Sequence, residues 1–145
     1  MTIMLIVAAS LQLTDFFAAL LRQSDPFAAV PKLCSRAFGA REGVWRRYDA
    51  DHGFVELGPF EGGKPRKIVI AAQFDTRASA VAYLDRISVL LASHPQPPLR
   101  PGTESYRGSI VIGRKLTGLE IELVECGVAI TLTAGGPRTV VPLSP

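Results

Sequence analysis

The amino-acid sequence predicts a single α+β domain over residues 1–145: an antiparallel sheet with N-terminal helices and one long central helix packed on one face. Helical patterns at residues 14–38 and 76–94 do not alternate one-for-one with the strand patterns, which argues against a doubly wound sheet. The last third of the chain reads as strands joined by short links, which favours an antiparallel meander. A content of 48% hydrophobic and 20% charged residues is typical of a globular domain.

The N-terminal quarter combines an apolar run with two short helical patterns. We interpret residues 3–8 as a buried strand; the alternative is a secretion signal, although no basic residue precedes the apolar run. Thr14 is expected to cap a first helix. Asp25 is expected to cap a second helix with Pro26 at its first position, and Pro31 to break or kink that helix.

Strand patterns follow. Residues 44–48 and 53–57 are predicted strands on either side of "DADHG", and "GPFEGGKP" is predicted to be a loop because it is dense in Gly and Pro. "KIVIAAQF" is apolar enough for a central strand. Thr76 should then cap the long helix, which is expected to end at His94 because Pro95 cannot continue it. The apolar positions at helical spacing in that helix are Ala80, Leu84, Ile87 and Leu91.

The segments "YRGSIVIG", "LEIELVE", "VAITLTA" and "TVVPL" complete the predicted sheet. Glu120 and Glu122 alternate with apolar residues, which indicates a sheet with one wet face. The two glutamates could act as an acid and a base, but the wet face of an amphipathic strand explains them without chemistry.

The stretch "WRRY" supplies the candidate binding residues. Strand alternation places Trp45 and Arg47 on one face and Arg46 and Tyr48 on the other. Aromatic and Arg side chains on a sheet can stack nucleic-acid bases. However, the net charge is only +3 and no recognised RNA or DNA motif is present, so we do not expect a nucleic-acid partner.

Asp49, Asp51 and His52 form the candidate metal site, since carboxylates and an imidazole can hold a divalent cation. A polar hairpin turn explains "DADHG" equally directly, and we favour the turn. We therefore expect no cofactor. The alternative is a small metal-dependent enzyme or small-ligand binder that uses the Asp49–His52 tip or the Glu120 and Glu122 face.

Other motifs carry little chemistry. Cys34 and Cys126 lie far apart without CxxC spacing, and we interpret them as reduced thiols of a cytoplasmic protein. The sequence has no GxSxG elbow and no phosphate-binding loop. "PQPPLR" fits a polyproline ligand pattern, but we favour a stiff linker. These observations leave the question of catalysis open and lean against an enzyme.

The run from Leu33 to Phe74 resembles small bacterial immunity proteins of polymorphic toxin systems. The resemblance rests on a helix ending near "AFG", a Trp, and "GFVELGPF" and "KIVIAAQF" as paired strands. It implies a cytoplasmic protein without catalytic residues that binds a toxin domain and blocks its active site. Many immunity proteins against nucleases are acidic, whereas this chain is slightly basic, so the resemblance does not imply a basic toxin.

We therefore expect a non-enzymatic protein-binding domain with an immunity or antitoxin-like role, a protein partner and no membrane association. A further alternative is a self-associating structural protein, including a homodimer, because strand edges invite pairing between copies.

Overall fold

The computed structural model describes residues 13–37, 39–41, 45–50, 52–92 and 104–135. In chain order the elements are a first helical segment over residues 13–21, α2 (Pro26–Ala37), β1 (Gly39–Arg41), β2 (Arg46–Ala50), β3 (Gly53–Glu61), β4 (Lys64–Gln73), α3 (Arg77–Leu91), β5 (Ser105–Ile112), β6 (Lys115–Val124) and β7 (Gly127–Ala134). The predicted α+β class is confirmed. The strands expected at residues 3–8 and 139–143 and the "PQPPLR" segment lie outside the described residues.

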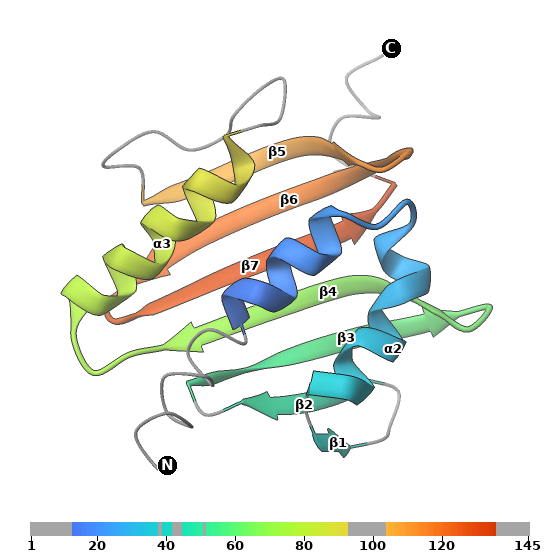
Figure 1. The fold of residues 1–145 in the computed structure, drawn as a ribbon, viewed down its shortest axis with the longest axis horizontal. Helices are drawn as coiled ribbons and strands as arrows, with labels where there is room; N and C mark the ends of the chain where they lie inside the picture. Colours follow the sequence, from blue (N-terminus) through green and yellow to red (C-terminus); the bar gives the residue numbers. More distant parts are fainter. Residues whose placement is uncertain (1–12, 38, 42–44, 51, 93–103, 136–145) are drawn as a thin grey trace.

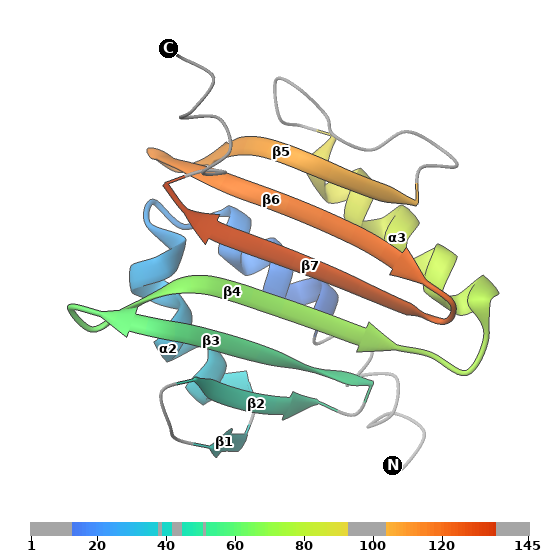
Figure 2. The same cartoon turned by 180° about the vertical axis from the view of Figure 1, so that it is seen from behind.

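The sheet is antiparallel throughout, in the order β1-β2-β3-β4-β7-β6-β5. Two meanders, β1 to β4 and β5 to β7, meet at the central β4–β7 pair. α3 carries the chain from β4 to the far edge strand β5, so this central pair joins strands that are distant in sequence. The described helices all lie on one face of the sheet (Figure 1), and the view from behind shows the strands in front of them (Figure 2).

A row of buried side chains crosses the sheet beneath the helices. Tyr48, Val55, Ile70, Ile130 and Ile121 are successive register partners, and each is at most 2% exposed. The helices cover this row with further buried residues, among them Phe17, Leu20, Val30, Cys34, Tyr83, Ile87 and Leu91. Because side chains alternate along a strand, this core also determines which residues face away from the helices.

Two helix starts agree with the sequence prediction. Asp25 precedes α2, and its Oδ1 accepts a hydrogen bond from the backbone N–H of Ala28 at 3.3 Å. Thr76 caps α3, where its Oγ1 accepts from the backbone N–H of Ser79 at 3.1 Å. Both side chains satisfy an amide that has no partner within its helix.

The prediction of a loop over residues 58–65 is wrong. β3 ends at Glu61 and β4 begins at Lys64, so only Gly62 and Gly63 form the turn. Both have positive φ, 58° and 80°, which suits a tight hairpin turn. On β3, Pro59 follows Leu57, the last residue paired with β2; on β4, Pro65 precedes Lys67, the first residue paired with β7. Each proline therefore lies where its strand has a neighbour on one side only, so it removes no hydrogen bond from a doubly paired segment.

Two helix boundaries, and the interior of α2, also differ from expectation. Thr14 does not cap the first helical segment, because residue 13 is already helical. Of the break or kink expected at Pro31, the break does not occur: α2 is continuous from Pro26 to Ala37, with Val30 and Cys34 buried near the ring. α3 ends at Leu91 rather than at His94, which lies outside the described residues.

Candidate functional site

We call the side of the sheet opposite the helices the open face, defined by two rows of register partners. The first row, in strand order, is Arg47, Glu56, Val69, Thr131, Glu120 and Arg107. The second row is Asp49, Phe54, Ala71, Ala129, Glu122 and Ser105. These residues alternate with the buried core positions, so they point away from the helices. Figure 2 views the sheet from the side opposite the helices.

In the middle of these two rows the side chains are small and uncharged; the nearest charge along β4 on this face is the exposed Lys67. Val69 and Ala71 on β4 lie beside Thr131 and Ala129 on β7, and all four are half-buried. Charged residues lie on both flanks, and in the first row their order is mirrored. Reading across the sheet, Arg on β2 and Glu on β3 precede the strip, and Glu on β6 and Arg on β5 follow it. The result is a shallow central strip of small side chains between two charged borders.

The β5–β6 flank of the open face is hollowed. A hollow of about 330 Å³ is lined by residues that include Arg107, Glu120, Glu122 and Thr131. The Nε of Arg107 lies 3.1 Å from Oε1 of Glu120, so this pair neutralises itself. A neighbouring hollow of about 270 Å³ also borders Glu122. Among the described residues Glu122 has no ion-pair partner, so the flank presents one uncompensated carboxylate, as the wet-face interpretation of this strand predicts.

The "WRRY" residues are separated by the fold. Tyr48 is buried in the core, so its side chain does not reach a partner while the fold is intact. Arg47 lies on the open face, where its guanidinium stacks 3.8 Å from the Phe54 ring centroid. Arg46 stacks over Phe60 at 4.1 Å. Trp45 precedes β2 and is 40% exposed, which leaves an aromatic surface at this end of the sheet.

Of the three candidate metal residues the structure describes two, Asp49 and His52, and each has other contacts. The Ala50–Gly53 pair closes the β2–β3 hairpin, in agreement with the predicted turn. Asp49 Oδ1 accepts a hydrogen bond from Arg47 Nε at 3.1 Å, and the His52 ring stacks with Phe74 at 6.1 Å. Asp51 lies outside the described residues. Within the described part of the chain, no group of three His, Cys, Asp or Glu side chains could hold a metal.

The cysteines are free. Cys34 is fully buried, and this burial raises the pKa of its thiol to about 12. A thiol with so high a pKa is protonated at neutral pH and is a poor nucleophile. Cys126 is partly exposed in the β6–β7 turn.

A second region, which sequence reasoning missed, lies at the opposite end of the strands from the β6–β7 turn. There the β3–β4 turn, the β5–β6 turn and the start of α2 surround a pocket of about 380 Å³. We call it the basic pocket, because it is lined by four cationic residues, Lys64, Arg66, Arg114 and Lys115, against the two acids Asp25 and Glu61. These residues come from three distant segments, so no local motif reveals them.

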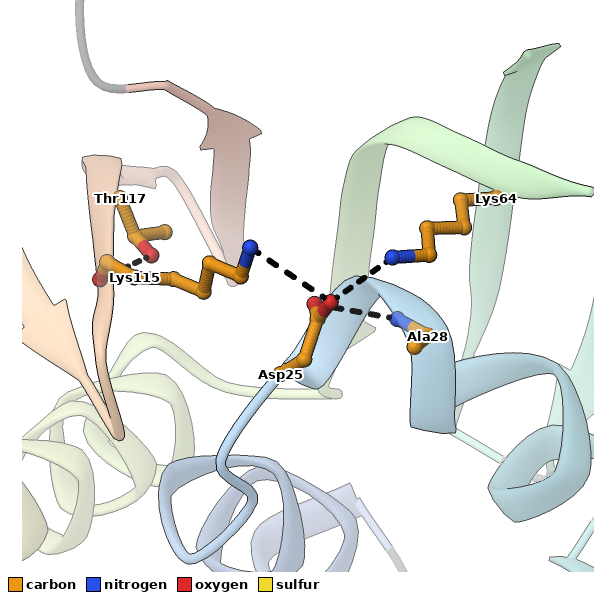
Figure 3. Close-up of polar contacts among 5 residues, drawn as sticks. All are labelled: Asp25, Ala28, Lys64, Lys115 and Thr117. Carbon is orange, nitrogen blue, oxygen red and sulfur yellow. Dashed lines mark hydrogen bonds and ion pairs between the residues drawn. The ribbon is translucent and has the colours of Figure 1, made fainter. Parts of the chain in front are cut away.

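Asp25 is the electrostatic centre of the basic pocket (Figure 3). Lys64 Nζ donates to its Oδ2 at 3.0 Å, and Lys115 Nζ lies 3.9 Å from the same oxygen. Burial of the carboxyl acts to raise its pKa, but the hydrogen bonds from Lys64 and Ala28 and the two lysine charges outweigh it, so the pKa of Asp25 is lowered. The carboxylate is therefore ionised at neutral pH while it also caps α2.

No protein-family model matches this chain, and neither a curated protein nor a solved structure matches it. None of the helices in the described residues is long and apolar enough to cross a membrane.

Proposed function

We propose that this protein is a non-enzymatic binding domain whose open face receives a partner protein. The observation that carries the proposal is the central strip of Val69, Ala71, Ala129 and Thr131. A sheet face normally carries either a covering layer or a polar surface. Within the two rows the strip is half-buried and uncharged and the charges lie on the flanks, while Lys67, exposed on β4, places a cation at one end of the strip. This arrangement matches an apolar interface centre with a polar rim.

The size of the open face supports a specific complex. From the usual spacing between strands and the rise per residue, we estimate the area of a six-stranded face at roughly 800 Å². This is the area that one partner contributes to a standard interface. The small side chains of the strip leave room for larger apolar side chains from the partner. Glu122 favours a Lys or Arg at the matching position, because a carboxylate covered by an interface needs a charged partner.

A second copy of this chain is a poorer occupant of the open face than a different protein. A face-to-face dimer with aligned strands has its two-fold axis either along or across the strands. An axis along the strands, between β4 and β7, sets Arg47 opposite Arg107 of the other copy because the first row is mirrored. An axis across the strands, along the first row, sets each residue of that row opposite itself, including Glu56. Both arrangements put like charges together, and opposed like charges destabilise a sheet contact.

The resemblance of residues 33–74 to immunity proteins suggests what the partner is. In an immunity or antitoxin-like role the partner is a toxin domain, and binding blocks its active site. One equivalent of this chain, added to the purified partner, should then abolish the partner's activity. A complex that retains full activity would contradict this role while leaving protein binding intact.

A small-ligand or metal-dependent function remains the second candidate, since the hollow beside Glu122 has the volume of a small-molecule site. Elemental analysis of the purified protein separates the two candidates. Stoichiometric zinc or manganese that is lost in Glu122→Gln would favour the metal-dependent function.

Protein binding is tested by comparing two variants, each of which adds one arginine at a different place on the surface. Thr131→Arg puts a long cation in the middle of the strip, and Ala82→Arg puts the same group on the exposed side of α3. Once the partner is captured and purified, we expect Thr131→Arg to weaken the complex at least about 30-fold, as at an interface centre, and Ala82→Arg to change it little. Equal affinities for the two variants would overturn the proposal.

A further inference from the structure

We propose that the basic pocket is a binding site for a small organic anion, one that carries a carboxylate or phosphate on an apolar body. None of the residues that line the pocket belongs to the two rows that define the open face. The proposal rests on the charge of the pocket, its apolar lining and the rigidity of its walls.

The pocket has more positive than negative charge. Of its four cations, Lys64 and Lys115 share the single carboxylate of Asp25. Arg66 pairs with Glu61 at 3.4 Å, across an exposed contact. Arg114 has no ion-pair partner among the described residues. Two formal positive charges are therefore left over, and a bound anion would compensate them.

The floor of the pocket is apolar. Phe27 and Pro65 are buried beneath it, and Leu116 and Ala134 complete the lining. Leu116 is 54% exposed, which is high for a leucine in a strand. A simple inorganic anion would leave this surface wet, whereas a ligand with an aromatic or aliphatic body would cover it. The volume of about 380 Å³ suits such a small molecule.

Contacts within the chain hold the walls of the pocket in place. The backbone N–H of Arg114 donates to the carbonyl of Ser24 at 3.3 Å, which fastens the β5–β6 turn to the loop before α2. Gly113 has φ 62°, and a Cβ at this position would collide with the Ser24 backbone. The close approach therefore requires glycine, and it fixes where the Arg114 side chain leaves the turn. Such pre-organisation lowers the entropic cost of binding.

Asp25 supplies the anion that the two lysines of the basic pocket contact. Its carboxylate holds the two lysines, so a ligand must share them with it. Asp25→Asn keeps a good helix-capping side chain but removes the competing charge. This variant should therefore bind an anion more tightly than the wild type, an outcome that a non-specific surface attraction does not require.

The test is calorimetric titration of the full chain at low salt with phenyl phosphate, benzoate and inorganic phosphate. We expect saturable 1:1 binding of at least one of the first two, tighter than inorganic phosphate; the comparison of phenyl phosphate with benzoate shows which anionic group is preferred. Arg114→Gln should weaken binding about tenfold, the loss of one charge-assisted hydrogen bond. Arg86→Gln, an exposed change on α3, is the matched control and should have little effect.

Three results would overturn the proposal. The first is no saturable binding of phenyl phosphate or benzoate. The second is an equal effect of Arg114→Gln and Arg86→Gln, which would indicate general electrostatic attraction. The third is an affinity for phenyl phosphate and benzoate that is unchanged or weaker in Asp25→Asn, with helix content preserved by circular dichroism.

Discussion

Arg107 on edge strand β5 and Glu120 on β6 are register partners, and their side chains form an ion pair of 3.1 Å across the open face. Both side chains are more than half exposed. Water and salt screen such a pair, so it contributes little to folding. Its place beside the central strip makes it part of the surface that a partner would meet.

A double-mutant cycle measures the folding contribution of this pair. Arg107→Ala, Glu120→Ala and the double variant should give a coupling free energy below about 1 kcal/mol in urea unfolding. The coupling should fall further in high salt. A coupling above about 2 kcal/mol would mean that the pair is a structural support of the sheet and not a surface feature.

The ionisation of Asp25 should give stability a pH dependence. The folded-state pKa lies below the ordinary value of 3.8, so the stabilisation from the ionised carboxylate is complete above that value and is lost as the pH falls through the folded-state pKa. The unfolding free energy of the wild type relative to Asp25→Asn should therefore be constant near neutral pH and decrease below about pH 4. Urea melts at a series of pH values check this. Parallel profiles for the two proteins would show that the lysine contacts are not formed in solution.

Two glycines with nearly the same φ should respond differently to a methyl group. Gly113→Ala adds the cost of the left-handed backbone and a collision with Ser24, whereas Gly62→Ala, at φ 58°, meets nothing within 4 Å. We expect Gly62→Ala to cost about 1 kcal/mol and Gly113→Ala clearly more. Thermal or urea unfolding of both variants gives the comparison. Equal costs would mean that the β5–β6 turn is not fastened to the loop before α2.

Tyr48 and Trp45 lie three residues apart but in different surroundings. Tyr48→Ala should cost about 3–5 kcal/mol, since the ring is 2% exposed in the core. Trp45→Ala should cost less than about 2 kcal/mol, because the indole is 40% exposed. If Trp45 contacts the partner, Trp45→Ala will weaken the complex without unfolding the chain. A Trp45→Ala variant as unstable as Tyr48→Ala would show that the indole belongs to the core.

The sequence predicts those features whose causes are local. Asp25 and Thr76 predict the starts of their helices, because an N-cap and the amide that it satisfies are only three residues apart in the sequence. The alternation around Glu120 and Glu122 identifies a strand with one wet face, because that pattern needs no knowledge of the neighbouring strands. The meander of β5, β6 and β7 follows from short links for the same reason.

The remaining features depend on residues that are distant in sequence. Gly58 and Pro59 have the composition of a loop, yet the pairing of β3 with β4 keeps both in an extended strand. The β4–β7 pair, which creates the central strip, has no local signal. The basic pocket brings Asp25, Lys64 and Lys115 together only after the sheet has formed (Figure 3). A pattern search along the chain therefore finds the elements and misses the surfaces that they build.

The most direct test of the open face is quantitative capture from lysate of the source cells with three baits: the wild type, Thr131→Arg and Ala82→Arg. A stoichiometric partner should be retained by the wild type and by Ala82→Arg and lost with Thr131→Arg, while all three baits show the same unfolding midpoint. The same partner bound equally by all three would contradict the account. So would a chain that captures no other protein and forms a dimer that Thr131→Arg dissociates, since the occupant of the open face would then be a second copy.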